Sequence, residues 1–549
     1  MAESQPTLSE LITLFLIMGV VLLPWLTLVT AELCLALYRR KVVTSMRGDG
    51  LPPAAGDAAA RGEPRPVRLN VEAADEATAA PSSAGGALYE QWRVAVRETT
   101  AVYLAAGAAY AAVLTAAYLV RLQAPLATVP ALVLAFSWPT LLTGILVAVP
   151  RRRRQILYVT AYWILFFAAC VSFVAEQAVW LVGANIVATI VALVVRARRI
   201  RAVAPLVGAF YTVLGIAILT ILGALMMVGQ SSSQDISGLE VAVVLVLMLA
   251  MPVVGGLGAW RALRGIGGLY AAKRTSEQTI TTAAIWLIFA GVHASTLAYN
   301  DLRWMAVGLA AFAAFVVVTT GGFRRLHRRS ARAGAPRLLV LRFFALGRHS
   351  RQLFDRLTAR WRHIGSVQLI AGPDLASSTV EPHEFFDFLC RKLGSRFLAD
   401  AAAVERAFDG LDTHADHDGR YRITDFFCRD SVWREVFARL AAGSDVVLMD
   451  LRGFSSGNCG CTYELSELLN LVPLERVAIV IDGATDAAFL TRTLEAASAR
   501  LSSASPNAVI PALDLHVFRD AAGRAPDPDR LLRLMCERAG TGRALAAAG

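Results

Sequence analysis

The segment Ser444–Asn470 (SDVVLMDLRGFSSGNCGCTYELSELLN) brings together the residue types that ligand chemistry needs. Its first residues predict a buried strand, its middle a polar Gly- and Ser-containing loop, and its end a helix that carries Glu464. In parallel α/β sheets, ligands bind at the carboxyl ends of strands, where such loops open. A carboxylate there can stabilise a developing positive charge, whereas the structural alternative is a first-turn glutamate favoured by the helix dipole.

The loop in this segment also offers groups that can hold phosphates. Arginine makes bidentate contacts to phosphate, and the free N–H groups at a helix start attract anions. The candidate ligand-binding residues of the segment are Asp450, Arg452, Ser455, Ser456 and Asn458. With Glu464 as the candidate catalytic group, the set suits cleavage of an N-glycosidic bond, in which a carboxylate near the ribose stabilises an oxocarbenium-like state.

A second set of candidate ligand-binding residues follows the predicted strand at 338–344. Arg342, Arg348 and Ser350 lie on or just after this strand, where a helix opens at the same edge of the sheet. They are plausible anion ligands. The alternative is that they solvate a loop beside a basic membrane surface.

No metal site is predicted. Residues 412–419 (DTHADHDG) faintly resemble a calcium loop, but the usual first Asp and final bidentate Glu are absent, so we interpret them as a polar, solvated insertion. Cys459 and Cys461 lack the second pair of ligands that a zinc site requires.

Short strands alternate with amphipathic helices from residue 337 onward. Strands are predicted at 338–344, 366–371, 445–450, 477–482 and 513–518, and helices at 349–362, 383–398, 431–442, 460–470, 486–500 and 528–538. Several of the strands are continuous apolar runs, which is typical of a parallel sheet covered on both faces. Crossovers of this length produce right-handed βαβ units. The pattern therefore predicts a flavodoxin-like α/β domain with a five-stranded parallel sheet.

The motif S-x-x-x-x-C-x-x-E-L, from Ser456 to Leu465, follows a helix and a strand in an order that resembles Toll/interleukin-1 receptor (TIR) domains. The resemblance implies the same five-stranded fold. In TIR domains that hydrolyse NAD, the helix glutamate is catalytic, which by position is Glu464; NAD is then a substrate, and no cofactor is predicted. The family's Trp before the Cys is Gly460 here. The match is close over 433–465, and the region 372–429 is longer than its TIR counterpart.

The composition excludes an ordinary soluble protein. Hydrophobic residues make up 56% of the chain and charged residues 18%, and the mean hydropathy is +0.52. The net charge is +11, but the basic clusters lie at the ends of apolar segments, at 39–41, 151–154, 196–201 and 324–332. Because this is the positive-inside pattern of membrane proteins, we do not expect nucleic-acid binding.

Nine apolar segments are long enough to cross a bilayer. They cover 11–37, 99–120, 127–149, 156–174, 178–195, 204–228, 241–260, 279–298 and 304–322. The basic clusters place the N-terminus outside and the C-terminal domain in the cytoplasm, and the Ala- and Arg-rich composition suggests a bacterial inner membrane. We interpret His293 as a packed residue rather than a proton relay, and Gly255, Gly256 and Gly258 as helix-packing positions.

The predicted organisation has five parts. They are a first transmembrane helix (1–44), a disordered cytoplasmic loop (45–97), an eight-helix transmembrane region (98–323), a basic linker (324–336) and the cytosolic TIR-like α/β domain (337–549). The loop is expected to be disordered because its Ala-, Pro-, Gly- and acid-rich composition buries too little apolar surface to offset the entropy of ordering.

Three functions fit these features. The leading hypothesis is a homo-oligomeric membrane protein whose cytosolic domain binds, and hydrolyses, NAD or a related nucleotide in signalling or defence. The second is a non-enzymatic, membrane-anchored signalling or scaffold module. The third is a transporter regulated by the cytosolic domain, which is less favoured because few charged residues lie inside the predicted spans.

Overall fold

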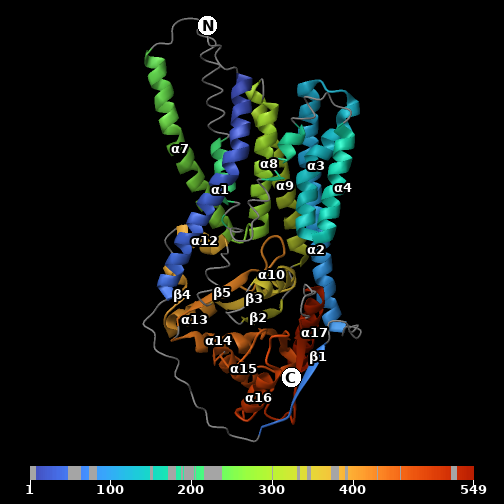
Figure 1. Cartoon of the computed structure of the whole chain (residues 1–549), viewed down its shortest axis with the longest axis vertical. Helices are drawn as coiled ribbons and strands as arrows, with labels where there is room; N and C mark the ends of the chain where they lie inside the picture. Colours follow the sequence, from blue (N-terminus) through green and yellow to red (C-terminus); the bar gives the residue numbers. More distant parts are fainter. Residues whose placement is uncertain are drawn as a thin grey trace. The chain divides into compact units, whose positions relative to one another are not determined.

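The computed structural model of the chain forms two compact units (Figure 1). It describes residues 8–46, 64–72, 83–148, 152–170, 181–186, 189–190, 203, 206–215, 238–298, 301–330, 334–342, 348–371, 382–389, 393–429, 431–457, 459–520 and 528–548. The first unit comprises Met1–Tyr38, Val96–Arg329 and Thr379–Cys390. The second comprises Arg39–Ala95, Ser330–Ser378 and Arg391–Gly549.

The first unit is helical (Figure 1). Its helices are α1 (Leu8–Met46), α2 (Ser83–Leu122), α3 (Val129–Ala148), α4 (Arg152–Cys170), α7 (Gly238–Ala271), α8 (Glu277–Leu297), α9 (Met305–Ser330) and α12 (Pro382–Leu389), with α1 and α2 also contributing residues to the second unit. Short 3-10 turns, Leu126–Thr128 and Leu302–Trp304, precede α3 and α9.

Three helical stretches among the described residues are long and apolar enough to cross a membrane: Ala84–Arg121, Leu126–Gly144 and Met305–His327. They coincide with the predicted spans at 99–120, 127–149 and 304–322. The predicted spans at 11–37, 241–260 and 279–298 fall on helices, and so do the described residues of the span at 156–174, up to Cys170. Their crossing of a membrane stays a prediction. The predicted spans at 178–195 and 204–228 lie largely outside the described residues.

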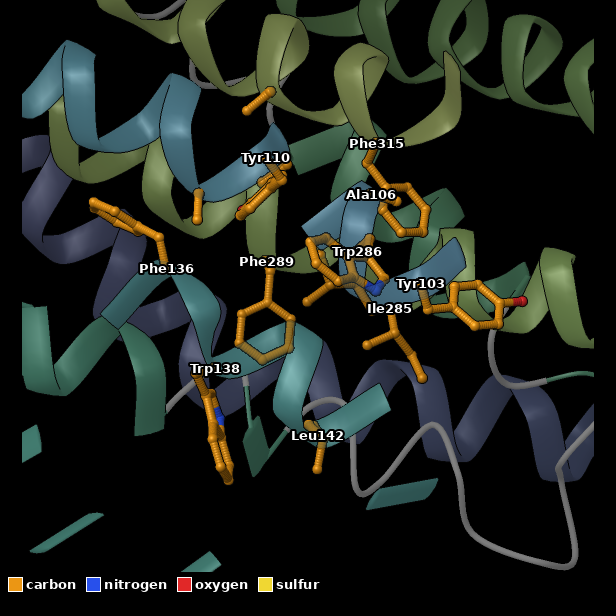
Figure 2. Packing of buried hydrophobic residues seen from close by; sticks show 14 of the residues in the cluster. Tyr103, Ala106, Tyr110, Phe136, Trp138, Leu142, Ile285, Trp286, Phe289 and Phe315 are labelled. Atoms are coloured by element: carbon orange, nitrogen blue, oxygen red, sulfur yellow. The ribbon is translucent and has the colours of Figure 1, made fainter. Parts of the chain in front are cut away.

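Aromatic side chains from four helices form the centre of the first unit (Figure 2). The Trp286 ring of α8 stacks on Phe315 of α9 at 4.3 Å and meets Tyr110 of α2 edge-on at 4.8 Å. Its indole Nε1 donates a hydrogen bond of 3.1 Å to Thr143 of α3. His293 is fully buried and lies edge-on against Phe136, a packed position like the one predicted for it. Large rings in edge-on and stacked contact therefore fix how these helices pack.

Close approach of α8 and α9 depends on a different glycine from those predicted. A Cβ added at Gly308 would lie 2.7 Å from the Ala290 carbonyl oxygen, which is closer than real side chains come. By contrast, among the described residues a Cβ at Gly256 or Gly258 would meet nothing within 4 Å, and one at Gly255 would touch only a Leu214 methyl group. The packing role predicted for Gly255, Gly256 and Gly258 stays a prediction.

Helix α12 belongs to the first unit, although the sequence analysis placed its residues in the α/β domain. Its Phe385 and Phe386 are part of the apolar core of the first unit. The buried Glu384 accepts a 3.1 Å hydrogen bond from the Tyr38 hydroxyl of α1. The predicted continuous helix at 383–398 is accordingly split, and its last residues form a 3-10 turn, Leu393–Arg396, and a short strand.

The second unit is built on one parallel sheet of eight strands, not five (Figure 1). The strands are β1 (Val67–Glu72), β2 (Arg337–Arg342), β3 (Ser366–Ala371), β4 (Phe397–Leu398), β5 (Ile423–Cys428), β6 (Val446–Asp450), β7 (Val477–Ile481) and β8 (Leu513–Arg519). Their order across the sheet is β1-β8-β7-β6-β2-β3-β5-β4. The five predicted strands are all present and adjacent, and β5, β4 and β1 extend the sheet at its two edges.

Helices cover both faces of this sheet. They are α10 (Arg348–Trp361), α13 (Ala401–Asp409), α14 (Trp433–Gly443), α15 (Cys459–Leu471), α16 (Ala487–Ser498) and α17 (Pro528–Ala548), with a 3-10 turn at Leu474–Arg476. Helices α14, α15 and α16 pack side by side, and α10 packs with α17. Every residue of β6 and β7 is buried, as expected for central strands covered on both sides.

The expectation of a disordered loop over 45–97 was wrong where β1 and the first turns of α2 lie. β1 pairs in parallel with β8, from Val67 opposite Leu513 to Glu72 opposite Phe518. Its apolar residues Val67, Leu69 and Val71 pack on the core of the second unit. Six residues with alternating apolar side chains are enough for an edge strand, even inside a segment whose average composition is polar.

The Gly308 contact predicts a specific effect on stability. Gly308→Leu should destabilise the protein by about 1–3 kcal/mol, because the new side chain forces α8 and α9 apart. Thermal unfolding of the detergent-solubilised protein measures the effect. Gly321→Leu is the matched control on the same helix, since a Cβ at Gly321 meets nothing within 4 Å. Equal shifts for the two variants would contradict this packing role.

Candidate functional site

Three neighbouring strands end at aspartates on one edge of the sheet. Asp450 is the last residue of β6, Asp482 follows β7, and Asp520 follows β8. Because β8, β7 and β6 are parallel neighbours, their carboxyl ends lie together. The sequence analysis singled out only Asp450. Asp482 and Asp520 each follow a buried apolar strand in the same way, and this signal would have found them.

Arg452 joins two of these aspartates in a buried ionic cluster. Its Nε and one terminal nitrogen donate to the two Asp450 oxygens at 2.9 and 2.7 Å. Its other terminal nitrogen donates to Asp520 Oδ2 at 2.9 Å. The Arg452 side chain is 4% exposed, so these charges interact with little solvent between them. The guanidinium that was predicted to contact phosphate is therefore engaged by two carboxylates.

Asp482 fixes the loop that follows β6. Its Oδ1 accepts hydrogen bonds from the backbone N–H of Gly453 and the hydroxyl of Thr485, at 2.9 and 3.0 Å. The one hydroxyl proton of Thr485 is shared between Asp482 Oδ1 and the Leu451 carbonyl, which also lies 3.0 Å away, and the Asp486 N–H donates to the Phe454 carbonyl. Gly453 has a φ of +69°, which a residue with a side chain rarely adopts. The loops after β6 and β7 are thus tied together over residues 451–454.

Glu464 lies on α15 and is 9% exposed. Among the residues that the structure describes, no group donates a hydrogen bond to its carboxyl or forms an ion pair with it. Burial raises the pKa of Glu464 to about 8. Near neutral pH, this carboxyl therefore holds its proton in the resting protein.

Glu464 and Asp450 both lie within electrostatic reach of Cys461. The pKa of the Cys461 thiol is raised to about 12, first by burial and then by the charges of Glu464 and Asp450. A thiol in this state is a poor nucleophile. The site thus combines a protonated carboxyl, an ionic cluster and an inert thiol at the carboxyl edge of the sheet.

The remaining predicted ligand-binding residues lie in the loop before α15, at the end of β2 and at the start of α10. Ser455 and Ser456 are exposed in the loop before α15, and Asn458 lies outside the described residues. Arg342 ends β2 directly opposite Asp450 in the strand register. Arg348 and Ser350 lie in the first turn of α10. The ligand contacts predicted for these residues stay predictions.

An aromatic and cationic stack next to this helix was missed by the sequence analysis. The rings of Trp433 on α14 and Tyr463 on α15 meet at 5.2 Å and 74°. The Arg434 guanidinium lies 4.7 Å from the centre of the Tyr463 ring. Pairs of this kind stabilise the packing of adjacent helices, here α14 on α15.

Residues 412–419 are only in part the solvated insertion that was predicted, since His414 is exposed whereas two of the aspartates are buried. Asp416 is fully buried and pairs with the Arg422 guanidinium at 2.8 Å, and Asp418 is also buried. Burial raises the pKa of Asp416 to about 6, although Arg422 opposes the shift. Gly419 has a φ of +79°. Among the described residues, no group of three His, Cys, Asp or Glu side chains could hold a metal ion.

Comparison of the chain with models of protein families, with curated proteins and with solved structures finds no match.

The ionic cluster predicts a large cost for removing its cation. Arg452→Met should destabilise the protein by about 3–5 kcal/mol, because Asp450 and Asp520 are left buried without a counter-charge. Denaturant unfolding at neutral pH measures this loss. The free energy of unfolding of Arg452→Lys should lie between those of the wild type and Arg452→Met, because lysine keeps the charge but cannot make the bidentate contact. Arg492→Met, at an exposed arginine of α16, should have almost no effect; similar losses at both positions would refute the cluster's role.

The raised pKa of Glu464 predicts how stability changes with pH. Between about pH 4.5 and 8 the folded carboxyl keeps its proton while the unfolded one loses it, so this group destabilises the fold increasingly as pH rises. Each unit of pKa shift corresponds to about 1.4 kcal/mol. Glu464→Gln should therefore gain stability over wild type between pH 5 and pH 8.

Denaturant midpoints at pH 5 and pH 8 test this prediction. The matched control is Glu467→Gln, one turn along α15, where the side chain is only partly buried. Its midpoint relative to wild type should not change with pH. A pH-independent difference between Glu464→Gln and wild type would show that the Glu464 carboxyl is ionised in the folded protein.

Proposed function

We propose that the chain is a multi-pass protein of a bacterial inner membrane, with its N-terminus outside and a cytoplasmic α/β domain that binds and hydrolyses NAD or a related nucleotide. The observation that carries the proposal is Glu464: a buried carboxyl, without a counter-charge among the described residues, at the ligand-binding edge of a parallel sheet. The role we propose is in signalling or defence, as in the TIR domains that the motif around Glu464 resembles.

The strand order supports this proposal. The five central strands run β3-β2-β6-β7-β8, which in chain order is the 2-1-3-4-5 arrangement of flavodoxin-like folds. In such sheets ligands bind at the switch point between the first and third strands, here β2 and β6. Arg342 and Asp450 end these two strands opposite each other. This position of Arg342 and Asp450 supports the proposal that the loops after β2 and β6 hold the ligand.

The chemistry of Glu464 suits glycosidic cleavage. Breaking the bond between nicotinamide and ribose develops positive charge on the sugar. A carboxylate in a low-dielectric site gains much more from a nearby cation than an exposed one does. Glu464 would therefore release its proton to water when the cationic nicotinamide ribose binds, and its carboxylate would stabilise the charge on the ribose as neutral nicotinamide leaves. A water molecule then adds to the ribose carbon and releases a proton to solvent. The exposed Ser455 and Ser456 hydroxyls are the proposed phosphate contacts.

The membrane assignment rests on the three stretches that are long and apolar enough to cross a bilayer. With the remaining predicted spans, they make up the nine-span arrangement that we propose. Helices of this kind hold copies of a protein in one plane with one orientation, which raises their effective concentration. A homo-oligomer whose α/β domains act together is the corresponding proposal for assembly.

This function predicts nicotinamide release by the full-length protein. Purified protein, reconstituted in liposomes at high density, should convert NAD to nicotinamide, and Glu464→Gln should lower the rate at least about 100-fold, the scale on which a single charge-stabilising group acts. Glu467→Gln should retain the wild-type rate. NAD binding, followed by calorimetry, should persist in Glu464→Gln.

The contrary outcomes lead to different functions. Wild-type turnover in Glu464→Gln would remove the catalytic role from this residue. Binding of NAD without turnover by any form would favour a ligand-binding module. Absence of both binding and turnover would favour the non-enzymatic scaffold.

A further inference from the structure

The edge of the sheet at β8 is a binding site for an extended segment. β1 occupies it with six consecutive residue pairs, Val67–Glu72 against Leu513–Phe518. Val67, Leu69 and Val71 face the core, while Arg68 and Asn70 are exposed. This alternation fixes the register, because a shift by one residue would turn the apolar side chains to solvent.

Arg65 gives the site its specificity. Its terminal nitrogens donate to three backbone carbonyls in the loop before β8: Asn507 and Ile510 at 2.9 Å, and Ala508 at 2.7 Å. The Arg65 backbone N–H also donates to the Ser498 hydroxyl at the end of α16. Three carbonyls arranged around one guanidinium recognise arginine and reject a neutral side chain, which would leave them with fewer donors.

The receiving side of this site is a preformed part of the fold. Asn507 is fully buried, and its side-chain nitrogen donates to the carbonyls of Leu469 and Val472 at 2.6 and 2.8 Å. Its side-chain oxygen accepts from the Leu474 N–H. The loop that binds Arg65 is therefore anchored to the end of α15 by contacts that do not involve β1.

The chain connections of β1 do not require it to bind its own copy. Its partner strand lies more than 440 positions later in the sequence. Residues 47–63 separate the segment 64–72, which contains β1, from α1, and residues 73–82 separate it from α2. By covalent geometry alone, these stretches reach up to about 60 Å and about 35 Å. The strand pairs and the printed hydrogen bonds of the site all involve residues 498–518 of the receiving chain, so a neighbouring copy offers the same groups.

We propose that residues 64–72 bind the β8 edge of a second copy of this chain, so that neighbouring copies are joined by exchanged strands. Exchange preserves all the contacts of the closed form and therefore costs little. Copies anchored in one membrane share depth and orientation, which favours exchange further. The inference rests on the β1–β8 contacts and does not depend on the chemistry of Glu464.

Disulfide trapping in isolated membranes tests the exchange. Arg68 and Asp514 are direct partners in the register and both are exposed, so a cysteine pair at these positions can form a disulfide. Two full-length copies with different tags, one Arg68→Cys and the other Asp514→Cys, are expressed together and oxidised mildly. A disulfide-linked product that carries both tags should form at several times the level given by either variant with wild type.

Two matched variants report on specificity. Adding Arg65→Ala to the Arg68→Cys copy should lower the mixed product severalfold, because the three loop carbonyls lose their donor. Asn70→Cys in place of Arg68→Cys should also lower the yield of the mixed product. Residue 70 faces the same side of the strand but pairs with His516, two residues beyond Asp514.

The double variant Arg68→Cys/Asp514→Cys in one chain, diluted with excess wild type, measures pairing within a copy. The proposal is overturned if this chain forms its internal disulfide fully while the two single variants give no mixed product above background. It is equally overturned if neither arrangement forms a disulfide, since β1 would then not pair with β8.

Discussion

The buried ion pairs of Arg452 are the interaction on which the carboxyl edge of the sheet in the α/β unit depends. Burying three charged groups is costly, and their mutual attraction offsets that cost only when the geometry is good. Here a bidentate contact to Asp450 and a third bond to Asp520 meet that condition. Since Asp450 ends β6 and Asp520 follows β8, the cluster fixes the ends of two strands on either side of β7.

The acidic side chains of this region differ in whether they have a hydrogen-bond or ion-pair partner. Asp450 and Asp520 share one arginine, and Asp482 accepts backbone and hydroxyl hydrogen bonds. Glu464, on α15, is buried without such a partner among the described residues, and burial raises its pKa to about 8. A carboxyl kept neutral in this way can still ionise and pair with a bound cation. Asp450 and Asp520 are already paired with Arg452. This contrast makes Glu464 the candidate for chemistry and its neighbours the support.

The sequence predicted the strands whose residues form continuous apolar runs, and it did not predict contacts between distant parts of the chain. The central strands β2, β3, β6, β7 and β8 were predictable because each is an apolar run flanked by amphipathic helices. β1 was missed because Val67, Leu69 and Val71 alternate with polar residues inside an Ala- and Pro-rich segment, and only β8 gives them a core to join. The role of Arg452 depends on Asp520, 68 positions away, so no local pattern could reveal it. Likewise, the close contact of Gly308 with α8 depends on tertiary packing, which the local sequence around a glycine does not show.

The hydrogen bonds of Asn507 connect the candidate site on α15 with the strand exchange that we propose at the β8 edge. Its side chain holds the end of α15, the helix that carries Glu464, and its backbone carbonyl accepts from Arg65 next to β1. Occupation of the β8 edge and the position of α15 therefore share one buried residue. If β1 comes from a neighbouring copy, assembly in the membrane acts on the helix of the candidate site through this residue. An isolated domain that begins at residue 337 lacks β1, and with it the Arg65 contacts to the loop that Asn507 anchors.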